Sequence, residues 1–334
     1  MNRRVLLLII GSLLLPLGCG DNDGPTDPPV QLVLEPSELC SDHPDAAIAT
    51  FEDANLEAAI RVALSVGAQE DLTCGLISGL TELRDESSGI TSLVGIQNLT
   101  GLKGLYLSYN SITDIGALSG LTSLTYLRLD HNSISDISAL GGLTSLTNLD
   151  LYHNSISDIS ALSGLTSLIG LYLDHNSITD ISALSGLTGL RTLHLNNNSI
   201  TDISALSGLT SLTNLSLSDN SITDIGPLSG LTGLTHLWLR DNSISDIGPL
   251  SGLTSLTYLY LDNNSISNVS ALSGLTTLVY LNLDSNPNIT DIQPLLDNTG
   301  LGAGDRVLLR VTSVSCTDVA ALQAKGVTVQ SDCP

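Results

Sequence analysis

Hydrophobic and polar positions follow one repeated pattern along most of this chain. Between residues 99 and 296, apolar residues recur in the form L-x-x-L-x-x-L-x-L-x-x-N, followed at fixed offsets by isoleucines and a further leucine. The unit 121–142, LTSLTYLRLDHNSISDISALSG, shows the complete pattern. Its asparagine recurs every 22 residues, at Asn110, Asn132, Asn154, Asn176, Asn198, Asn220, Asn242, Asn264 and Asn286. Nine copies at one constant period predict a solenoid in which each repeat packs against its neighbours.

Each repeat predicts one short strand and one turn. The L-x-L part, such as Leu127 and Leu129, predicts a strand whose leucines both point into the core, because side chains alternate along a strand. Parallel strands of successive repeats stack about 4.8 Å apart, so nine repeats form a ribbon roughly 40 Å long. The recurring asparagine turns inward, where its amide must find backbone partners. The return path is too short for a full helix and predicts a 3₁₀ turn. We therefore expect an α/β solenoid, a right-handed horseshoe with a concave parallel sheet and convex 3₁₀ turns.

Both ends of the array predict caps, since an open solenoid end would expose its core. Between Thr50 and Ser65 the apolar residues fall at helical spacing, and Asp53 is placed to cap the start of that helix. A degenerate unit follows, with Ser88 in the asparagine position. The expected layout is an N-terminal helical cap with the degenerate first repeat at 37–98, nine repeats at 99–296, and a C-terminal cap at 297–334.

The amino terminus has the features of an export signal. Two arginines precede an apolar run at residues 5–15, which is shorter than the roughly 20 residues that a bilayer span needs. Residues 1–18 therefore predict a signal peptide. The run LPLGC ending at Cys19 resembles the lipobox of bacterial lipoproteins, with Pro16 where that family usually has leucine. The resemblance implies cleavage before Cys19 and lipidation of its thiol. The alternative is a plain secretory signal that leaves Cys19 as a spare thiol.

Residues 19–36 begin rich in proline, glycine and aspartate and offer almost nothing to bury. They predict a flexible tether between the lipidated Cys19 and the folded part. We expect the protein to be exported to a bacterial cell envelope, at the surface or facing the periplasm, and to contact the membrane only through its lipid anchor.

The cysteines agree with export. Five are present, and lipidation of Cys19 leaves Cys40, Cys74, Cys316 and Cys333 to pair in an oxidising compartment. Four cysteines allow three connectivities. A bridge needs Cα atoms within about 7 Å, and the predicted array separates the first two cysteines from the last two by far more. The sequence therefore predicts the bridges Cys40–Cys74 and Cys316–Cys333.

Charge and motifs narrow the classes of function. The formal net charge of −23 would repel a phosphate backbone, so nucleic acid is not an expected partner. The few lysines and arginines also argue against an anionic membrane patch. The sequence contains no G-x-S-x-G elbow, H-E-x-x-H pair or phosphate-binding loop, and an open solenoid face offers few enclosed pockets for a catalytic triad. We expect neither enzyme activity nor a cofactor.

The 22-residue unit closely resembles the internalin type of bacterial leucine-rich repeats. FEDANLEAAIRVAL (51–64) and GLTELRDESSGITSLVGIQNLTGL (79–102) are similar to the helical cap and first repeat of that class, and the tail from TGLGAGDRVLLRVTSVSC onward resembles the closing cap of related envelope proteins. The resemblance covers roughly residues 45–330. It implies that the concave face binds a protein or a glycan.

Variation between repeats is concentrated in four slots, those of Tyr126, Arg128, Asp130 and His131 in the unit 121–142. Across the array these slots hold all eight tyrosines, the single tryptophan and five of the six histidines. The strand propensity of aromatic residues explains part of this clustering but not the histidines. Aromatic variation on one face of a repeated scaffold predicts a ligand surface. Its candidate residues are Tyr106, Tyr126, Arg128, Tyr152, Tyr172, His194, His236, Trp238, Arg240, Tyr258, Tyr260 and Tyr280, with the densest aromatic group at Trp238, Tyr258, Tyr260 and Tyr280.

The same face is acidic, with Arg128 and Arg240 as exceptions; its carboxylates are Asp130, Asp150, Asp174, Asp219, Asp241, Asp262 and Asp284. A basic or hydroxyl-rich partner would suit it, and we expect a monomer. Two alternatives stay open. One is a passive surface-coat or spacer protein without a dedicated ligand. The other is a metal-binding face at His131, His153 and His175, which form one column on adjacent repeats. Copying of a short duplicated block is the competing explanation of that column.

Overall fold

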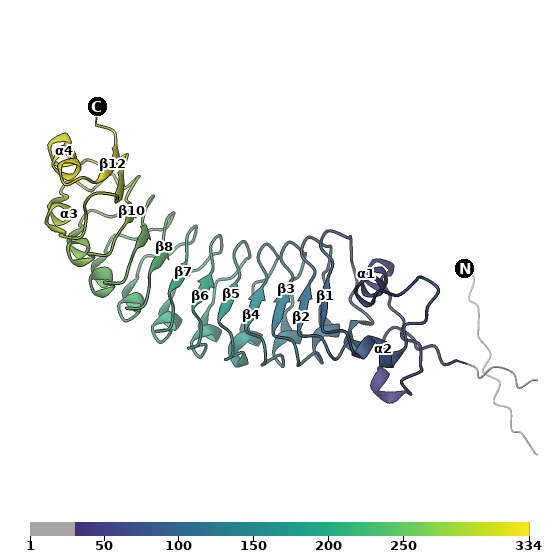
Figure 1. The fold of residues 1–334 in the computed structure, drawn as a ribbon. Coiled ribbons are helices and arrows are strands. Elements are labelled where there is room, and N and C mark those ends of the chain that lie inside the picture. Colours follow the sequence, from purple (N-terminus) through teal and green to yellow (C-terminus); the bar gives the residue numbers. More distant parts are fainter. Residues whose placement is uncertain (1–30, 334) are drawn as a thin grey trace, which may run out of the picture. The chain divides into compact units, whose positions relative to one another are not determined.

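Twelve short strands form one parallel sheet in chain order in the computed structural model, which describes residues 31–333. They belong to the unit Leu32–Pro334, where they lie along the inner side of the curve in Figure 1, with the 3₁₀ turns on the outer side. Neighbouring strands pair residue for residue, so equivalent leucines of successive repeats lie side by side. The strands are β1 (Glu82–Arg84), β2 (Gly104–Tyr106), β3 (Tyr126–Arg128), β4 (Asn148–Asp150), β5 (Gly170–Tyr172), β6 (Thr192–His194), β7 (Asn214–Ser216), β8 (His236–Trp238), β9 (Tyr258–Tyr260), β10 (Tyr280–Asn282), β11 (Arg306–Leu309) and β12 (Thr328–Ser331).

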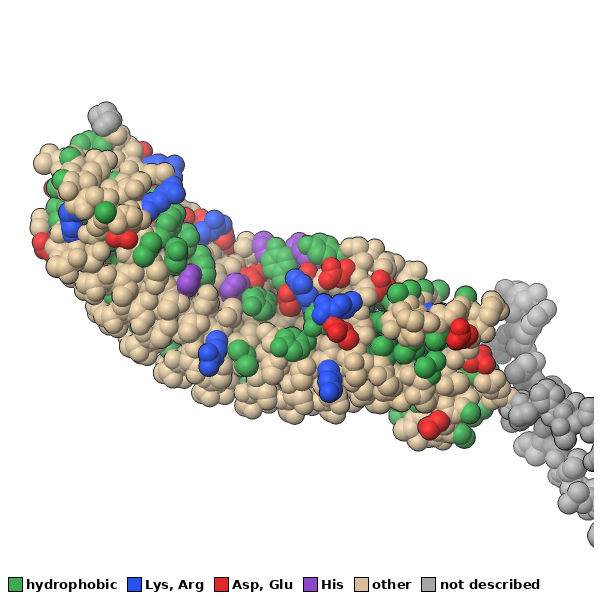
Figure 2. Space-filling view, viewed as in Figure 1, with side chains coloured by type: hydrophobic (Ala, Val, Ile, Leu, Met, Phe, Trp, Pro, Cys, Tyr) green, Lys and Arg blue, Asp and Glu red, His purple; other side chains and the backbone are tan. Residues whose placement is uncertain are grey.

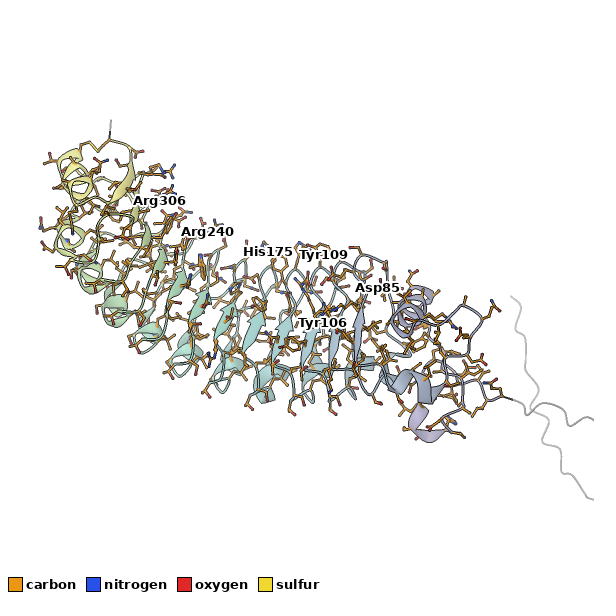
Figure 3. All side chains as sticks on the ribbon, viewed as in Figure 1. Asp85, Tyr106, Tyr109, His175, Arg240 and Arg306 are labelled. Atoms are coloured by element: carbon orange, nitrogen blue, oxygen red, sulfur yellow. A yellow bond between two sulfur atoms is a disulfide. The ribbon has the colours of Figure 1, made fainter. Side chains whose placement is uncertain are left out.

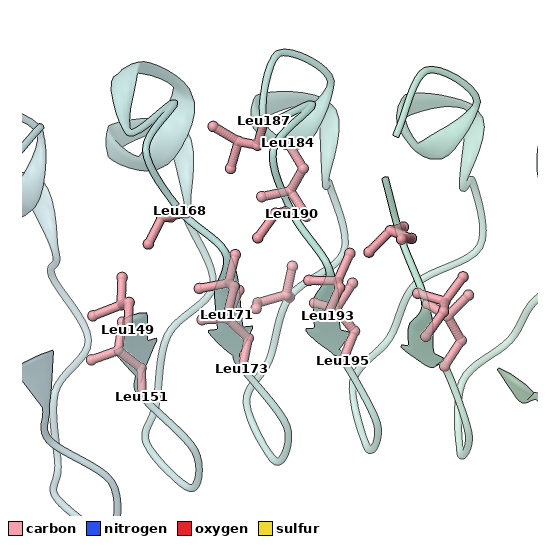
Figure 4. Packing of buried hydrophobic residues seen from close by; sticks show 14 of the residues in the cluster. Leu149, Leu151, Leu168, Leu171, Leu173, Leu184, Leu187, Leu190, Leu193 and Leu195 are labelled. Atoms are coloured by element: carbon pink, nitrogen blue, oxygen red, sulfur yellow. The ribbon is translucent and has the colours of Figure 1, made fainter. Parts of the chain in front are cut away.

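The core is a stack of leucine rows between the sheet and the turns. In β5, Leu171 and the following Leu173 are fully buried, and Leu168 before the strand is buried with them. Figure 4 shows the equivalent leucines of adjacent repeats packed one behind another. Burying each such side chain contributes about 1.5–3 kcal/mol. The predicted inward direction of both leucines of the L-x-L pattern is confirmed.

The recurring asparagine ties each repeat to its neighbour. The Oδ1 atom of Asn132 accepts a hydrogen bond from the Ile112 N–H at 3.0 Å. Its Nδ2 atom donates to the carbonyls of Leu107 and Leu129, both at 3.0 Å. Each later asparagine of the ladder likewise accepts from the N–H of the isoleucine 20 residues before it, at Asn154, Asn176, Asn198, Asn220, Asn242, Asn264 and Asn286. The predicted asparagine ladder is confirmed.

The return path of each repeat is a 3₁₀ turn, as predicted. An aspartate opens most turns: the Asp136 carboxylate accepts a hydrogen bond from the Ser138 N–H at 2.8 Å, and this bond holds the pKa of Asp136 below its ordinary value. The column of convex aspartates is therefore structural. The 3₁₀ segments are η1 (Cys40–Asp42), η2 (Ile96–Asn98), η3 (Gly116–Leu118), η4 (Ser138–Leu140), η5 (Ser160–Gly164), η6 (Ser182–Leu184), η7 (Ser204–Leu206), η8 (Gly226–Leu228), η9 (Gly248–Gly252) and η10 (Ser270–Gly274).

The N-terminal cap is built on helix α1 (Ala54–Leu64) and the short helix α2 (Cys74–Ser78). Leu56 and Ile60 of α1 are fully buried against the first leucine rows. Asp53 caps α1 as predicted, with its Oδ1 atom accepting from the Asn55 and Leu56 N–H groups. Its other oxygen, Oδ2, accepts from the N–H and the hydroxyl of Thr91 and from the Ser92 N–H. One carboxylate therefore joins the helix start to the degenerate first repeat.

The cap begins earlier than the sequence predicted. Leu34 is buried, and its N–H donates to the Ile48 carbonyl at 2.9 Å. The Pro36 carbonyl accepts a hydrogen bond from the Gln97 side chain at 2.7 Å. The prediction of a flexible tether up to residue 36 is therefore wrong for residues 32–36, which pair with the cap. Cys19 and the signal peptide lie outside the described residues.

The C-terminal cap continues the sheet, which the sequence did not reveal. Helix α3 (Gln293–Asp297) replaces a 3₁₀ turn, and β11, helix α4 (Cys316–Ala324) and β12 form two further coils of the solenoid. The ammonium group of Lys325 donates to the carbonyls of Leu296 at 2.8 Å and Leu295 at 3.2 Å, which satisfies the end of α3. None of the helices within residues 31–333 has both the length and the apolar character needed to cross a bilayer.

Both predicted disulfides are present. Cys40 and Cys74 join η1 to α2 with their Cα atoms 5.4 Å apart, and Cys316 and Cys333 join α4 to the end of the chain with their Cα atoms 5.5 Å apart. Each bridge closes one cap on itself.

Asp53 makes the stability of the N-terminal cap depend on pH. Burial alone would raise its pKa, but the hydrogen bonds from Thr91, Leu56 and Asn55 outweigh burial and hold the pKa below the ordinary 3.8. The folded carboxylate therefore adds stability at pH values above 3.8, and this contribution is lost as the pH falls through the folded pKa. We expect Asp53→Asn to cost about 2 kcal/mol at pH 7 and to cost less in strong acid.

Urea unfolding from pH 7 down to pH 2, followed by circular dichroism, measures this dependence. Glu52→Gln is the matched control, because Glu52 is exposed and accepts only the Ser92 hydroxyl. An equal loss for both variants at every pH would contradict the role assigned to Asp53.

Candidate functional site

The four variable slots all lie on the inner face of the curve or at its edge. The first and third residues of each strand, such as Tyr126 and Arg128, point away from the leucine core. The residue before each asparagine has a left-handed backbone, with φ of 53° at His131. Its N–H still donates to the next repeat, from His131 to the Tyr152 carbonyl at 2.9 Å. Figure 2 shows histidines together with charged and hydrophobic side chains along the inner side of the curve, while most of the outer side in this view is neither charged nor hydrophobic.

None of the twelve candidate residues is part of the buried core. Tyr126, Arg128 and Arg240 are exposed, and the other nine are half-buried. Figure 3 labels Tyr106 on β2 and Arg240 just after β8 from this set, together with Tyr109 and His175 between them along the solenoid. The structure therefore places the predicted residues on one continuous surface.

A hollow of about 680 Å³ lies in the middle of this surface, which is within the range of typical ligand sites. Seven candidates line it: Arg128, Tyr152, Tyr172, His194, Trp238, Arg240 and Tyr260. Tyr106 and Tyr126 instead line a smaller pocket of about 140 Å³ beside Arg128. The other three candidates do not line the hollow: His236 and Tyr258 begin β8 and β9, two residues before Trp238 and Tyr260, and Tyr280 begins β10. We call this 680 Å³ space the central hollow.

The aromatic side chains of β8 to β10 form a ladder. The rings of His236 and Tyr258 stack with centroids 4.7 Å apart and an angle of 14° between planes. Trp238 and Tyr260 stack at 5.8 Å and 15°, and Tyr260 lies 4.8 Å from Tyr280. These rings sit on adjacent parallel strands, so they cover one another's faces. The ladder therefore presents mainly ring edges and tyrosine hydroxyls to a partner.

Most carboxylates around the central hollow are paired with arginines. Arg128 lies 3.0 Å from Asp130 and 3.3 Å from Asp150. Arg240 lies 3.1 Å from Asp219 and 3.4 Å from Asp241. Burial raises the pKa of Asp150, even though the Tyr152 N–H and Arg128 favour its charged form.

Asp174 has a different environment. Its Oδ1 atom accepts hydrogen bonds from the Asn196 backbone and side chain at 3.0 and 2.6 Å, and its Oδ2 atom lies 3.9 Å from Nδ1 of His194. Burial raises the pKa of Asp174, and burial also lowers the pKa of His194 despite the nearby carboxylate. The partner of this carboxylate is therefore an imidazole that favours its neutral form.

The ligand-binding residues predicted from sequence cover only part of the hollow. Its lining also includes Tyr109, Asp130, His131, Asp150, Asp174, His175, Asn196, Asn197, Ser216, Ser218 and Asp219. From the sequence, the aspartates predict only that the face is acidic. Ser216 and Ser218 could have indicated the hollow from sequence. They place two small side chains in one repeat, at slots where the adjacent repeats have larger side chains.

The histidine column does not support the metal hypothesis. His131 and His153 stack with centroids 4.7 Å apart, and His153 and His175 with centroids 5.8 Å apart. The in-plane lone pairs of stacked imidazoles point side by side and do not converge on one ion. Within residues 31–333, no group of three or more His, Cys, Asp or Glu side chains is placed to hold a metal.

Tyr109 extends the histidine stack, with its ring centroid 4.1 Å from that of His131. Burial and the neighbouring imidazoles lower the pKa of His131.

Comparisons with known proteins agree with this geometry. The family of leucine-rich repeats in two copies matches residues 100–208, in overlapping windows, and 210–252, and a second leucine-rich-repeat family matches 232–287. No curated protein sequence matches the chain significantly.

Several solved structures are similar to this chain in both sequence and fold. An internalin from Listeria monocytogenes is 34% identical with a TM-score of 0.72, and the match covers 84% of this chain and 90% of that one. Internalin C2 of the same organism is 37% identical with a TM-score of 0.53, over 68% of this chain and 91% of that one. A leucine-rich-repeat protein of Leptospira interrogans, 23% identical with a TM-score of 0.65 over 77% and 73% of the two chains, shares the fold alone.

These matches cover the repeats that carry the central hollow. Repeats of this type form a binding fold that is not enzymatic. The internalin likeness and the two disulfides indicate an extracellular or surface protein. The chain is an internalin-like member of the leucine-rich-repeat family.

Proposed function

We propose that this chain is an envelope-anchored binding or adhesion protein that recognises a protein partner through its concave face from β2 to β10. One observation carries the proposal. The slots that differ between repeats form a continuous aromatic and acidic surface with a hollow at its centre, while the rest of the array repeats itself. A scaffold without a ligand needs no such variation on a single face.

The residue types on this face are those that dominate the energy of protein interfaces. Tyrosine, tryptophan and arginine are enriched among hot spots because they bury a large area and still offer polar atoms. Trp238, Tyr258, Tyr260 and Tyr280 are all half-buried before any partner binds. Their stacking holds the rings in place, so little side-chain freedom remains to be lost on binding.

The ladder favours a protein over a glycan. Sugar rings bind aromatic side chains mainly by lying flat on an exposed ring face. In the ladder the faces of His236, Tyr258 and Tyr260 are covered by neighbouring rings. Ring edges and hydroxyl groups suit the mixed apolar and polar surface of a protein. A glycan partner is the other outcome that the experiment below would detect.

The anchor is the second part of the proposal. The lipobox-like run ending at Cys19 supports lipidation, and the proline-rich stretch after it supports a spacer that presents the concave face to partners. Since residues 32–36 pair with the cap, the spacer that we propose is residues 20–31.

Capture of partners tests the proposal. The chain from residue 20 onward is immobilised and exposed to envelope and surface extracts, and bound proteins and glycans are identified by mass spectrometry. The variant Trp238→Ala, Tyr258→Ala, Tyr260→Ala is expected to bind the partner at least about tenfold more weakly, because each hot-spot truncation costs about 2 kcal/mol or more.

The control carries Thr210→Ala, Thr232→Ala and Thr254→Ala, three exposed residues outside the four variable slots. Both variants are first shown to unfold at the temperature of the parent protein. A partner that binds the parent and the control but not the aromatic variant supports the concave face as the site. Identical sets for all three proteins, or no partner at all, would favour a passive coat or spacer.

A further inference from the structure

We propose that the central hollow receives a lysine or arginine side chain of the protein partner, held between the carboxylate of Asp174 and the indole of Trp238. This inference rests on the proposed function and names the chemistry by which the partner is recognised. It draws on the shape of the hollow, the distribution of charge around it, and the way in which the chain uses its own arginines on the same face.

The hollow exists because one repeat carries small side chains. Ser216 and Ser218 form part of its floor and are buried. On the side of Trp238 that lies toward β9, Tyr260 stacks against the indole. On the other side Ser216 contributes no ring. The remaining rings near Trp238 are His236 of its own strand, with its centroid 5.6 Å away and its plane inclined by 25°, and His194, two strands away, at 6.1 Å and 61°. Trp238 therefore has one side covered by a stacked ring and borders the open hollow on the other.

The charges around the hollow leave one carboxylate for a partner. Four aspartates and two arginines line it. Asp130 and Asp150 share Arg128, and Asp219 pairs with Arg240. Among the described residues, the one basic group within ion-pair distance of Asp174 is His194, at 3.9 Å. Asp174 is 5% exposed and lines the hollow, so a cation that enters would complete a partly desolvated ion pair.

The hollow discriminates between classes of side chain. An anionic group would meet more carboxylates than guanidinium groups. A neutral apolar group would leave the buried Asp174 carboxylate without a counter-ion. A lysine ammonium or an arginine guanidinium can pair with Asp174 and lie against an aromatic side chain, where the ring quadrupole attracts it.

The chain already uses this contact at both ends of the same face. The guanidinium of Arg84 lies 3.7 Å from the ring centroid of Tyr106, and that of Arg306 lies 5.9 Å from the ring centroid of Tyr280. Each arginine comes from the strand next to that of its tyrosine. In the middle of the face, the strand next to Trp238 on the side of the hollow offers Ser216 instead. A cation from the partner would therefore take the position that an arginine of the chain occupies at each end.

Tryptophan fluorescence tests the inference without knowledge of the partner, because Trp238 is the single tryptophan of the chain. The probes are N-acetyl-arginine amide and N-acetyl-lysine amide, with N-acetyl-citrulline amide as the neutral analogue of arginine, at pH 7.5 and constant ionic strength. We expect a saturable change of emission with the two cations and at least about tenfold weaker binding of citrulline. Equal responses to arginine and citrulline would overturn the inference.

Variants locate the site. Asp174→Asn is expected to weaken binding of the cationic probes about tenfold, while Asp136→Asn, on a convex turn, leaves it unchanged. Ser216→Tyr is expected to fill the hollow and abolish binding without loss of thermal stability, since the same slot holds Tyr106, Tyr172 and Tyr260 in other repeats. Unchanged binding of the cationic probes by folded Asp174→Asn, or by Ser216→Tyr, would contradict the cation site. If Asp174→Asn does not fold, Ser216→Tyr still decides the question.

The outcome is separable from that of the proposed function. A captured partner that requires the aromatic ladder, together with no saturable response to either cation, would leave the proposed function standing and remove the cation site. Saturable binding of the cations that Asp174→Asn and Ser216→Tyr both weaken, together with no captured partner, would support the site and count against the dedicated protein receptor.

Discussion

Replacing Asn264 with alanine is expected to lower the free energy of unfolding by about 3–5 kcal/mol, because several buried groups each lose a hydrogen bond worth about 1–3 kcal/mol. Asn264 is 7% exposed and accepts from the Ile244 N–H at 3.0 Å. Its side-chain amide donates to the carbonyls of Leu239 at 3.0 Å and Leu261 at 3.1 Å. Alanine would leave these groups without partners inside the solenoid, where water cannot replace the amide.

The same repeat offers a matched control. Asn268 opens the convex turn, is exposed and accepts one hydrogen bond, from the Ser270 N–H at 2.8 Å. Asn268→Ala should cost about 1 kcal/mol, the usual effect of losing a capping side chain. Denaturant unfolding, followed by circular dichroism and by the emission of Trp238, measures both and reports whether the array unfolds as one unit. If Asn264→Ala and Asn268→Ala lowered the free energy of unfolding equally, the asparagine ladder would not stabilise the array as proposed.

Removing the Cys40–Cys74 bridge is expected to cost about 3–4 kcal/mol, from the loop-closure entropy of a loop of this length. The two cysteines are 34 residues apart and hold η1 against α2 at the open end of the array. The cap also depends on Asn98, whose side chain accepts from the Cys40 N–H at 2.8 Å and donates to the Glu38 carbonyl at 2.9 Å. Without the bridge the cap can separate from the first leucine rows and expose them.

The double variant Cys40→Ala, Cys74→Ala is compared with Cys316→Ala, Cys333→Ala by thermal and denaturant unfolding. The second bridge spans 17 residues, half as many, so its loss should cost about 0.6 kcal/mol less. Unfolding of the parent protein in reducing buffer should match that of a variant lacking both bridges. An unchanged midpoint for the first double variant would show that the cap holds without its bridge.

The repeat pattern predicted only part of the candidate site. The pattern identified which face varies, and the structure confirms that all twelve candidate residues lie outside the buried core. It did not identify Asp174 as the carboxylate paired only with an imidazole. Arg128 lies within ion-pair distance of both Asp130 and Asp150, but not of Asp174 one repeat further on. Those distances depend on which way each long side chain turns across the sheet, and a slot in the pattern does not specify that direction.

The histidine column shows the same limit. Spacing alone placed three imidazoles on adjacent repeats, close enough for a shared ion to be considered. In the structure all three histidines have a left-handed backbone, with φ of 53° at His131, and their rings stack face to face. Stacking satisfies these side chains through their ring faces, so their nitrogens have no common point to coordinate.

The sequence by itself determined the solenoid, the direction of its leucine rows, the asparagine ladder, the 3₁₀ turns and the pairing of the cysteines. These features follow from contacts between equivalent positions 22 residues apart, and such contacts are visible as a period. Only the tertiary structure decided that residues 32–36 pair with the cap, that β11 and β12 extend the sheet, and that a hollow opens above Ser216 and Ser218. These features depend on packing and side-chain direction at positions where the repeat is broken, and a broken repeat carries no period from which to predict them.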